Sequence, residues 1–497
     1  MNAIKSDNSN EMLIWVLAIV SAIGAGLVAI TGNIKLIGLI FAVVVGSAIA
    51  VSPAILFWVA VIGSLIVVGL VRLYLPEFQL VRWMIAPVSA LLLVHALIHL
   101  WPKANPDKSQ TFPAIITLGL LFIVINLFSS LINTQDIVSA VIGFKGYFQI
   151  WGLLFALAFI QWKKTLIDSL PKLFVLIAIC QIPFVIHQFV YIVPTRYGLG
   201  RGIVPVDIVA GTFGASLEAG GANAVLALYM LLVWSGAIAL WKNAALSTTK
   251  TLFISAVALA PVLINEAKVS VIYLVVAAFI VNRKGLLKNP ARFIGMTLLS
   301  VGLVASLFAA FIYHAPEGEV ESWSDLIEYT YNYNIAKDEN FEGGLSRGGA
   351  LKFWVQESGN MMNTLIGYGM GVSRVSENNE IARQLGITST GDFGVGNTAV
   401  SAILWESGLI GFGLVTAMFF IGFKTAVKLE KVYSEDSRQS ALFLGLQAAM
   451  VLLYISLWHK NFFVFHIGYQ TIAILAFGYL SYWQRQSLAD KATTDSL

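Results

Sequence analysis

The sequence predicts an all-α polytopic membrane protein, with about 12–14 transmembrane helices and a large extracytoplasmic loop that carries short helices. Hydrophobic residues make up 58% of the 497 residues, charged residues make up 12%, and the mean hydropathy is +0.80. A soluble domain needs more polar surface than this. The apolar runs are continuous and roughly 20 residues long, as in helices that cross a bilayer, whereas strands of a membrane barrel alternate over about ten residues.

The expected spans follow from the positions of these runs. We expect helices near residues 12–31, 34–51, 53–73, 83–101, 111–132, 139–161, 173–192, 221–241, 250–265, 268–282, 292–313, 398–424, 439–459 and 462–483. The first run is long for the core of a signal peptide, so we expect it to remain as a span. Cys180 is the only cysteine, which excludes an intramolecular disulfide.

The orientation follows from lysine and arginine, which accumulate in cytoplasmic loops. Basic residues occur in alternate loops, near residues 103–108, 163–172, 242–250, 283–292 and 424–438. The C-terminal tail is also basic and falls on the same side. Lys35, Arg72 and Arg82 are exceptions to this alternation. We therefore expect cytoplasmic termini and an outer, periplasmic position for the polar segments 193–220, 265–268 and 314–397. Because all three polar segments are expected on the same side of the membrane, we expect them to form one functional site.

The segment 314–397 is a large polar loop between spans. It holds 12 of the 27 acidic residues, together with Arg347, Arg374 and the glycine run Gly367-Tyr-Gly-Met-Gly371. We expect short helices in 323–333 and 349–363, on or in the outer membrane surface. The chain shows no internal repeat and no separate soluble domain, so residues 1–497 form a single integral membrane domain.

The segment 193–220 is rich in glycine and contains Arg196, Arg201 and Glu218. Glycines let backbone amides approach an anionic ligand, and an arginine can pair with a phosphate through two hydrogen bonds. The alternative is a flexible loop with two solvated arginines.

Two lysines lie at the outer starts of apolar spans. Lys268 stands beside Glu266, and Lys145 lies in Gly143-Phe-Lys-Gly-Tyr147. A charge at membrane depth faces a cavity or a partner. The alternatives are a salt bridge between Lys268 and Glu266, or lysines that extend to the interface.

Arg347 begins a stretch with small residues and aromatic rings. Two glycines follow it, and Phe353 and Trp354 come about two helical turns later. The small residues leave room for a bulky ligand, and the rings offer faces for a sugar. The alternative is an amphipathic helix anchored by aromatic and basic groups.

The base for a glycosyl transfer is a carboxylate or a histidine. The loop offers several carboxylates, any one of which could equally belong to a solvated surface. The histidines form no metal-binding pattern, since His95 and His99 are four residues apart without an accompanying carboxylate. We expect no metal.

Four motifs resemble, in order, those of the O-antigen polymerase and O-antigen ligase superfamily. They are Gly211-Thr-Phe-Gly214 before a displaced Asn223, Arg347 followed by Trp354, Leu365-Ile-Gly-Tyr-Gly-Met-Gly371, and Asn397 followed by Glu406-Ser-Gly-Leu-Ile-Gly411. The resemblance covers residues 200 to 415. It implies a GT-C type glycosyltransferase of the bacterial inner membrane, without a cofactor, that moves a glycan from undecaprenyl pyrophosphate on the periplasmic face.

The resemblance also implies roles for residues of this chain. Arg347 and Lys268 would hold the pyrophosphate. The resemblance leaves the base unassigned, and we predict Asp392 because it is the carboxylate nearest to Asn397 in the sequence. The other predicted substrate-binding residues are Arg196, Arg201, Lys145, Arg374, Trp354, Glu218 and Glu406.

The chain departs from the family at two places. Lys268 stands where the family often has arginine, so two-pronged phosphate binding is lost there. Ligases commonly carry a histidine just before the loop-closing asparagine, whereas Gly394-Val-Gly396 precedes Asn397. The missing histidine favours a polymerase, which transfers the glycan to another lipid-linked repeat unit, over a ligase, which transfers it to lipid A core.

Two other hypotheses stay open. One is a transporter or flippase for a lipid-linked or polyanionic substrate, which would be expected to show repeated halves and charges deep inside spans. The other is a structural partner in a polysaccharide-export complex. Expected partners are the lipid-linked donor, the glycan acceptor, the bilayer, a chain-length regulator and a flippase, with no nucleic acid.

Overall fold

Seven helical segments in the described part of the chain are long and apolar enough to cross a membrane. They are Pro53–Tyr74, Pro76–Leu100, Ala114–Ile132, Lys164–Arg196, Asn223–Lys242, Ala399–Val432 and Ser437–Ser456. The pair Ala140–Phe148 and Trp151–Phe159, bent by 43°, raises the number to eight if it crosses as one span. A multi-pass helical protein is thus confirmed.

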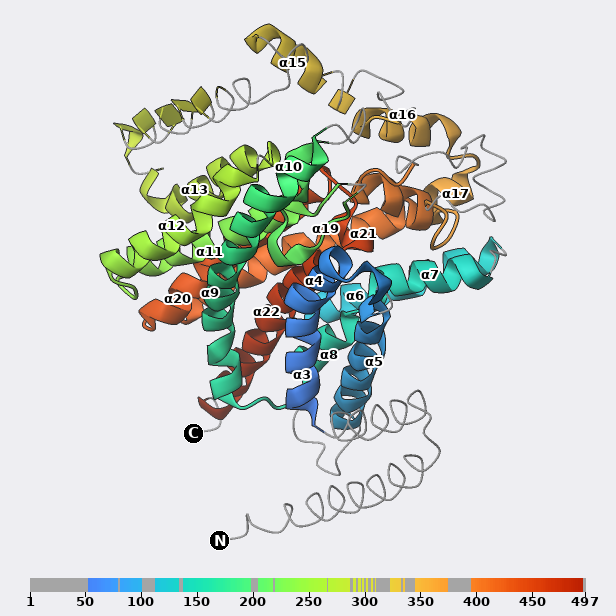
Figure 1. Ribbon diagram of the computed structural model, residues 1–497. Helices are drawn as coiled ribbons and strands as arrows, with labels where there is room; N and C mark the ends of the chain where they lie inside the picture. The colour runs from blue at the N-terminus through green and yellow to red at the C-terminus, as the bar shows by residue number, and fades with distance from the viewer. Residues whose placement is uncertain are drawn as a thin grey trace, which may run out of the picture.

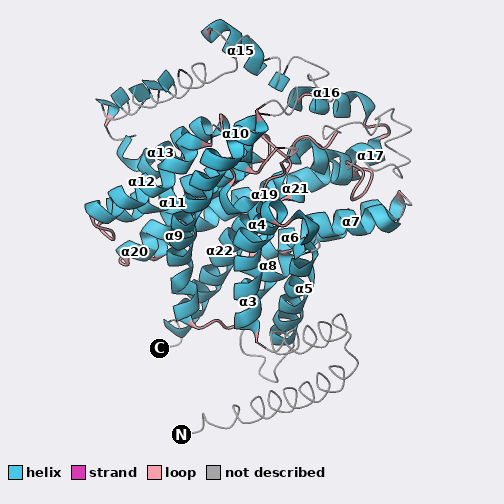
Figure 2. Cartoon of the chain, in the orientation of Figure 1, coloured by secondary structure: helices cyan, strands magenta, loops and turns pink. Residues whose placement is uncertain are grey.

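The computed structural model describes residues 52–78, 81–100, 112–133, 137–197, 204–217, 220–265, 267–286, 322–331, 334–335, 345–373 and 395–494, with short pieces between 289 and 309. Within these ranges the regular elements are helices, and the one β-bridge, between Ala215 and Gly221, is isolated (Figure 2). The predicted spans 12–31 and 34–51 lie outside the described residues, so the count of about 12–14 stays a prediction.

Figure 1 shows most of the helices in one bundle, with α15 (Trp323–Tyr331) apart from it at the top of the view. In chain order they are α3 (Pro53–Ile62), α4 (Val68–Tyr74), α5 (Val81–Leu100), α6 (Ala114–Ile132), α7 (Ile137–Phe148), α8 (Trp151–Phe159), α9 (Lys164–His187), α10 (Val193–Arg196), α11 (Asn223–Lys242), α12 (Thr248–Ile264), α13 (Val269–Leu286), α15 (Trp323–Tyr331), α16 (Arg347–Glu357), α17 (Met361–Ile366), α19 (Ala399–Val432), α20 (Ser437–Ser456), α21 (Phe462–Phe465) and α22 (Ile467–Thr494). Two π-helical turns, η1 (Gly63–Val67) and η3 (Gln188–Ile192), interrupt the spans that end at Tyr74 and Arg196. Short 3-10 turns include η4 (Pro205–Ile208) and η5 (Gly211–Phe213).

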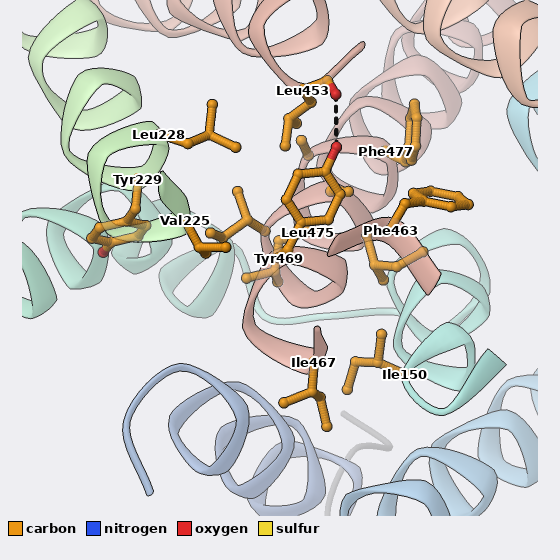
Figure 3. Packing of buried hydrophobic residues seen from close by; sticks show 14 of the residues in the cluster. Ile150, Val225, Leu228, Tyr229, Leu453, Phe463, Ile467, Tyr469, Leu475 and Phe477 are labelled. Carbon is orange, nitrogen blue, oxygen red and sulfur yellow. Dashed lines mark hydrogen bonds between the residues drawn. The ribbon is translucent and has the colours of Figure 1, made fainter. Parts of the chain in front are cut away.

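The core forms where α8, α11, α20 and α22 pack together (Figure 3). Tyr469 is fully buried there, and its ring contacts those of Phe462 and Phe463. The Tyr469 hydroxyl donates a hydrogen bond of 2.7 Å to the Leu453 carbonyl. A buried polar atom in an apolar bundle needs such a partner, because no water replaces it.

Three loops that the charge pattern places in the cytoplasm meet in the structure. The Lys284 Nζ lies 2.8 Å from a carboxylate oxygen of Glu430, whose other oxygen accepts a hydrogen bond of 2.9 Å from Gln447. The Lys242 Nζ donates to the Val281 carbonyl at 2.8 Å. Loops that the alternation of charge assigns to one side of the membrane therefore contact one another in the structure.

Candidate functional site

The segments predicted to lie outside come together at one end of the bundle, near α10, α16 and α17 (Figure 1). The Asn223 side chain donates to an Asp207 carboxylate oxygen at 2.9 Å and to the Asn265 carbonyl at 3.4 Å. Asn265 returns a hydrogen bond of 3.0 Å to the Asn223 carbonyl. These contacts join the segment 193–220 to the turn at 265–268.

The large loop closes on the same end through two asparagines. Asn397 Nδ2 donates to the Leu345 carbonyl at 3.0 Å, which holds the residues before α16 against the start of α19. Asn461 Nδ2 donates to the Gly396 carbonyl at 2.8 Å. The turn between α20 and α21 therefore contacts the residue that precedes Asn397.

The segment 204–217 enters the bundle without forming a long helix, and two glutamines of one span hold its backbone. The Gln188 Oε1 accepts from the amides of Ala210 and Gly211 at 3.0 and 2.7 Å, and its Nε2 donates to the Gly211 carbonyl at 2.8 Å. The Gln181 Oε1 accepts from the Thr212 amide at 2.7 Å. Irregular backbone at membrane depth is tolerated where protein groups satisfy it in this way.

Both π-helical turns touch this re-entrant segment. The Thr212 hydroxyl donates to the Leu65 carbonyl in η1 at 2.7 Å, and Gln188 is the first residue of η3. Single π turns inside α-helices occur frequently at functional sites. The Gly211-Thr-Phe-Gly214 motif is thus a backbone structure built between two irregular helices, with φ angles of +58° at Gly211 and +94° at Gly214.

The glycine turn after α17 packs against a break in α19. Gly408 has φ 63° and ψ −164°, which interrupts the helix. The amides of Tyr368 and Gly369 donate to the Trp405 and Glu406 carbonyls at 2.8 and 3.0 Å. A Cβ at Gly367 would overlap with the backbone of Glu406 and Ser407. The two motifs therefore form one close backbone contact.

Glu406 is fully buried and stabilises this turn. Its Oε1 accepts from the Ser373 hydroxyl at 2.5 Å and from the Ser373 amide at 3.2 Å. The contacts of Oε1 show that Glu406 supports the glycine turn, and its predicted role in binding substrate stays a prediction.

Arg347 is the first residue of α16, a helix capped by Ser346, whose hydroxyl accepts from the Gly349 amide at 2.9 Å. The Arg347 guanidinium donates through Nη1 to the Asn334 side chain, and its Nη2 lies 3.5 Å from His459 Nε2. An arginine has no acceptor, so His459 accepts through Nε2 in this contact. The most strongly predicted residue of the large loop thus faces the turn between α20 and α21.

The charges of this region are mainly basic. Burial lowers the pKa of His459, and the positive charges of Arg347 and Lys460 lower this pKa further. Burial also lowers the pKa of Lys460, while Asp207 raises it and Arg347 lowers it. We refer to Arg347, His459, Lys460 and Asp207 as the outer polar cluster. Because its basic groups destabilise one another's charged forms, the outer polar cluster is suited to an anion.

The other predicted basic residues lie in different surroundings. Lys268 is exposed at the start of α13. Arg196 is only 1% exposed, and its Nη1 donates to the Pro205 carbonyl at 3.1 Å within its own loop. Lys145 lies over the ring of Trp83, 3.9 Å from its centre. Of these three residues, Arg196 interacts electrostatically with Asp207 of the outer polar cluster.

Two features expected beside Arg347 differ from the prediction. Trp354 is buried and donates through Nε1 to the Leu404 carbonyl at 3.1 Å, so its ring packs against α19 and offers no open face to a sugar. A Cβ at Gly348 would lie 3.0 Å from the Ile335 carbonyl oxygen. The chain itself therefore fills the space expected for a ligand beside this glycine.

Four predicted site residues, Asp392, Arg201, Arg374 and Glu218, lie outside the described residues. Conversely, the sequence prediction did not include His459, Lys460 or Asp207. A signal for the first two exists, because His459-Lys-Asn461 is a polar tripeptide between two apolar runs. Among the described residues, no group of three or more His, Cys, Asp or Glu could hold a metal ion.

A search of protein-family models finds no match to the chain, and a search of curated proteins finds none either.

Proposed function

We propose that this protein is a bacterial inner-membrane glycosyltransferase that uses a glycan linked to a polyprenyl pyrophosphate. Within that class we propose a polysaccharide repeat-unit polymerase, which transfers the growing glycan to another lipid-linked repeat unit on the periplasmic face. The proposal combines the motif resemblance with the chemistry of the outer polar cluster.

The observation that carries the proposal is the convergence of Arg347 with His459 and Lys460. Arg347 comes from the large loop, whereas His459 and Lys460 come from a turn more than a hundred residues later, and the Arg347 Nη2 lies 3.5 Å from the His459 Nε2. A departing pyrophosphate develops negative charge, which fixed positive groups stabilise. Arginine pairs with phosphate oxygens through two hydrogen bonds, and lysine adds a point charge.

The position of Arg347 adds a second source of positive potential. Arg347 is the first residue of a helix of 11 residues, so its backbone lies at the positive end of the helix dipole. Helix N-termini favour phosphate groups for this reason. Lys460 takes the place that the motif resemblance assigned to Lys268 as the second cation.

The ligase and the flippase are the alternatives. Transporters also use broken helices and non-helical segments inside the bundle, as in α19 and residues 204–217. The flippase therefore stays an alternative for the experiments to test. Against it, the basic groups of the outer polar cluster lie at one end of the bundle, after the end of α20.

The first experiment removes the gene from its host and separates the surface polysaccharide on a gel. A polymerase deletion leaves single capped repeat units. Polymer that stays on the lipid carrier indicates a ligase, absence of outer glycan indicates a flippase, and an unchanged pattern contradicts all three.

The second experiment compares Arg347→Ala with Lys352→Ala, which removes an exposed lysine from the same helix. Loss of a group that stabilises developing charge lowers the rate about 10²–10³-fold. We expect short or absent polymer for Arg347→Ala at a normal protein level, and normal polymer for Lys352→Ala. Normal polymer from both variants would show that Arg347 does not hold the pyrophosphate.

A further inference from the structure

His459 lies where the outer segments meet, and the proposed reaction needs a base. Its Nε2 faces the Arg347 Nη2 at 3.5 Å. Two residues on, Asn461 is tied to the Gly396 carbonyl at 2.8 Å, next to Asn397. The turn between α20 and α21 therefore brings an imidazole to the end of the large loop. The loop itself has no histidine just before Asn397.

The contact with Arg347 fixes which nitrogen carries the proton. A guanidinium only donates, so the Nε2 lone pair points toward Arg347 and the proton of the neutral ring resides on Nδ1. The Nδ1 atom is buried, without a hydrogen-bond partner in the part of the chain that the structure describes. The basic nitrogen is thus the one that faces the phosphate-binding residue of the proposed site.

Building on the proposed function, we propose that His459 is the general base that accepts the proton of the acceptor hydroxyl, and that binding of the donor pyrophosphate to Arg347 activates it. When the pyrophosphate oxygens take the Arg347 donors, the hydrogen bond to Nε2 is released. The same anion neutralises the positive charges of Arg347 and Lys460. Nε2 is then free, and more basic, at the moment when a donor is present.

The step balances in atoms and electrons. The acceptor hydroxyl oxygen forms a bond to the anomeric carbon of the donor glycan, and its proton passes to His459 Nε2. The bond between the anomeric carbon and the pyrophosphate oxygen breaks, and the electron pair leaves with the polyprenyl pyrophosphate. His459 returns to neutral when it gives its proton to the departing pyrophosphate or to water.

The charged groups around His459 support this order of events. Arg347 faces it from α16, Lys460 precedes α21 on its own turn, Asp207 of η4 acts on Lys460, and the phenol of Tyr273 on α13 interacts with Arg347. Burial, Arg347 and Lys460 all lower the pKa of His459, so the ring is neutral at neutral pH and able to accept a proton. Because the neutral form is the active one, the transfer rate falls as the pH falls through the pKa that His459 has in the donor complex.

The experiment uses purified full-length protein in lipid nanodiscs, with undecaprenyl-pyrophosphate-linked repeat units as donor and acceptor. His459→Gln is compared with His187→Gln, which changes an outer histidine that contacts Tyr74. We expect His459→Gln to lower the transfer rate about 10²–10⁴-fold, the contribution of a general base. Binding of undecaprenyl pyrophosphate stays within about threefold, because Arg347 and Lys460 remain.

The pH profile separates catalysis from structure. The wild type and His187→Gln lose rate on the acidic side, between about pH 7 and pH 4, because burial keeps the pKa of His459 below that of an ordinary histidine. The residual rate of His459→Gln lacks this dependence. A His459→Gln variant with the wild-type rate, or a wild type whose rate does not change over this range, would overturn the assignment of the base.

The outcomes also separate this inference from the proposed function. A wild-type protein that transfers no glycan in this assay contradicts the proposed function itself. A wild-type protein that transfers glycan, together with a fully active His459→Gln, contradicts only the role of His459. If His459→Gln does not fold, His459→Asn and the wild-type pH profile give the same two answers.

Discussion

Replacing Gly408 by alanine tests the contact between the glycine turn and the broken helix. At φ 63° and ψ −164° this residue occupies a region that is accessible essentially only to glycine, and an alanine there costs about 1–3 kcal/mol. A Cβ would also overlap with the Leu365 backbone and lie 2.6 Å from the Gly367 amide nitrogen. Overpacking adds about 1–3 kcal/mol, and the backbone atoms cannot move without breaking the turn. We expect a loss of about 2–6 kcal/mol in the free energy of unfolding.

The assay is thermal unfolding of purified protein in one detergent, followed by tryptophan fluorescence. Gly413→Ala is the matched control, because Gly413 lies in the same helix with no other atom within 4 Å of an added Cβ. Alanine in a helix interior stabilises by about 0.5–1 kcal/mol relative to glycine. The Tm should therefore fall for Gly408→Ala and stay or rise for Gly413→Ala. Equal melting temperatures would refute the close contact between Gly408 and the glycine turn.

Three further predictions concern the re-entrant segment, the glycine turn and the orientation. Gln188→Ala should cost about 3 kcal/mol or more, because three backbone groups of residues 210 and 211 lose their partner, while the exposed Gln356→Ala should leave the Tm unchanged. Ser373→Ala should cost about 1.5–3 kcal/mol, since it removes a hydrogen bond to the buried Glu406 carboxylate; a Tm equal to that of the wild type would contradict this. The orientation can be tested with exposed single cysteines in a Cys180→Ser background. Met361→Cys in the large loop should react with a membrane-impermeant maleimide on intact cells, and Glu435→Cys in a predicted cytoplasmic loop should react only after permeabilisation. The reverse pattern would show the opposite orientation.

The helical class and the grouping of loops could be predicted from the sequence because both depend on local composition. Spanning helices depend on apolar runs, and the basic loops at Lys242 and Lys284 meet as the alternation of charge predicts. The break at Gly408 could not be predicted in this way. Glycine is common in membrane helices, and only the approach of Leu365 from the preceding loop makes its special conformation necessary.

The candidate site was predicted only in part because its residues come from distant parts of the chain. Arg347 stands out in the sequence as a basic residue in an acidic loop. His459 follows a long apolar run and resembles an ordinary helix end, and only tertiary packing brings it to Arg347. The surroundings of Trp354 and Glu406 could not be predicted either: both side chains are buried, and both form hydrogen bonds inside the fold.

The two π-helical turns also set the rotational phase of their helices. A π turn takes up one residue more than an α turn, so the outer part of each span keeps the phase of a regular helix that is one residue shorter. If the residues of η1 or η3 formed a regular α turn instead, everything beyond them would rotate by about 100°, and another side of α4 or α10 would face residues 204–217. The length of these spans is therefore constrained residue by residue, in a way that hydropathy does not reveal.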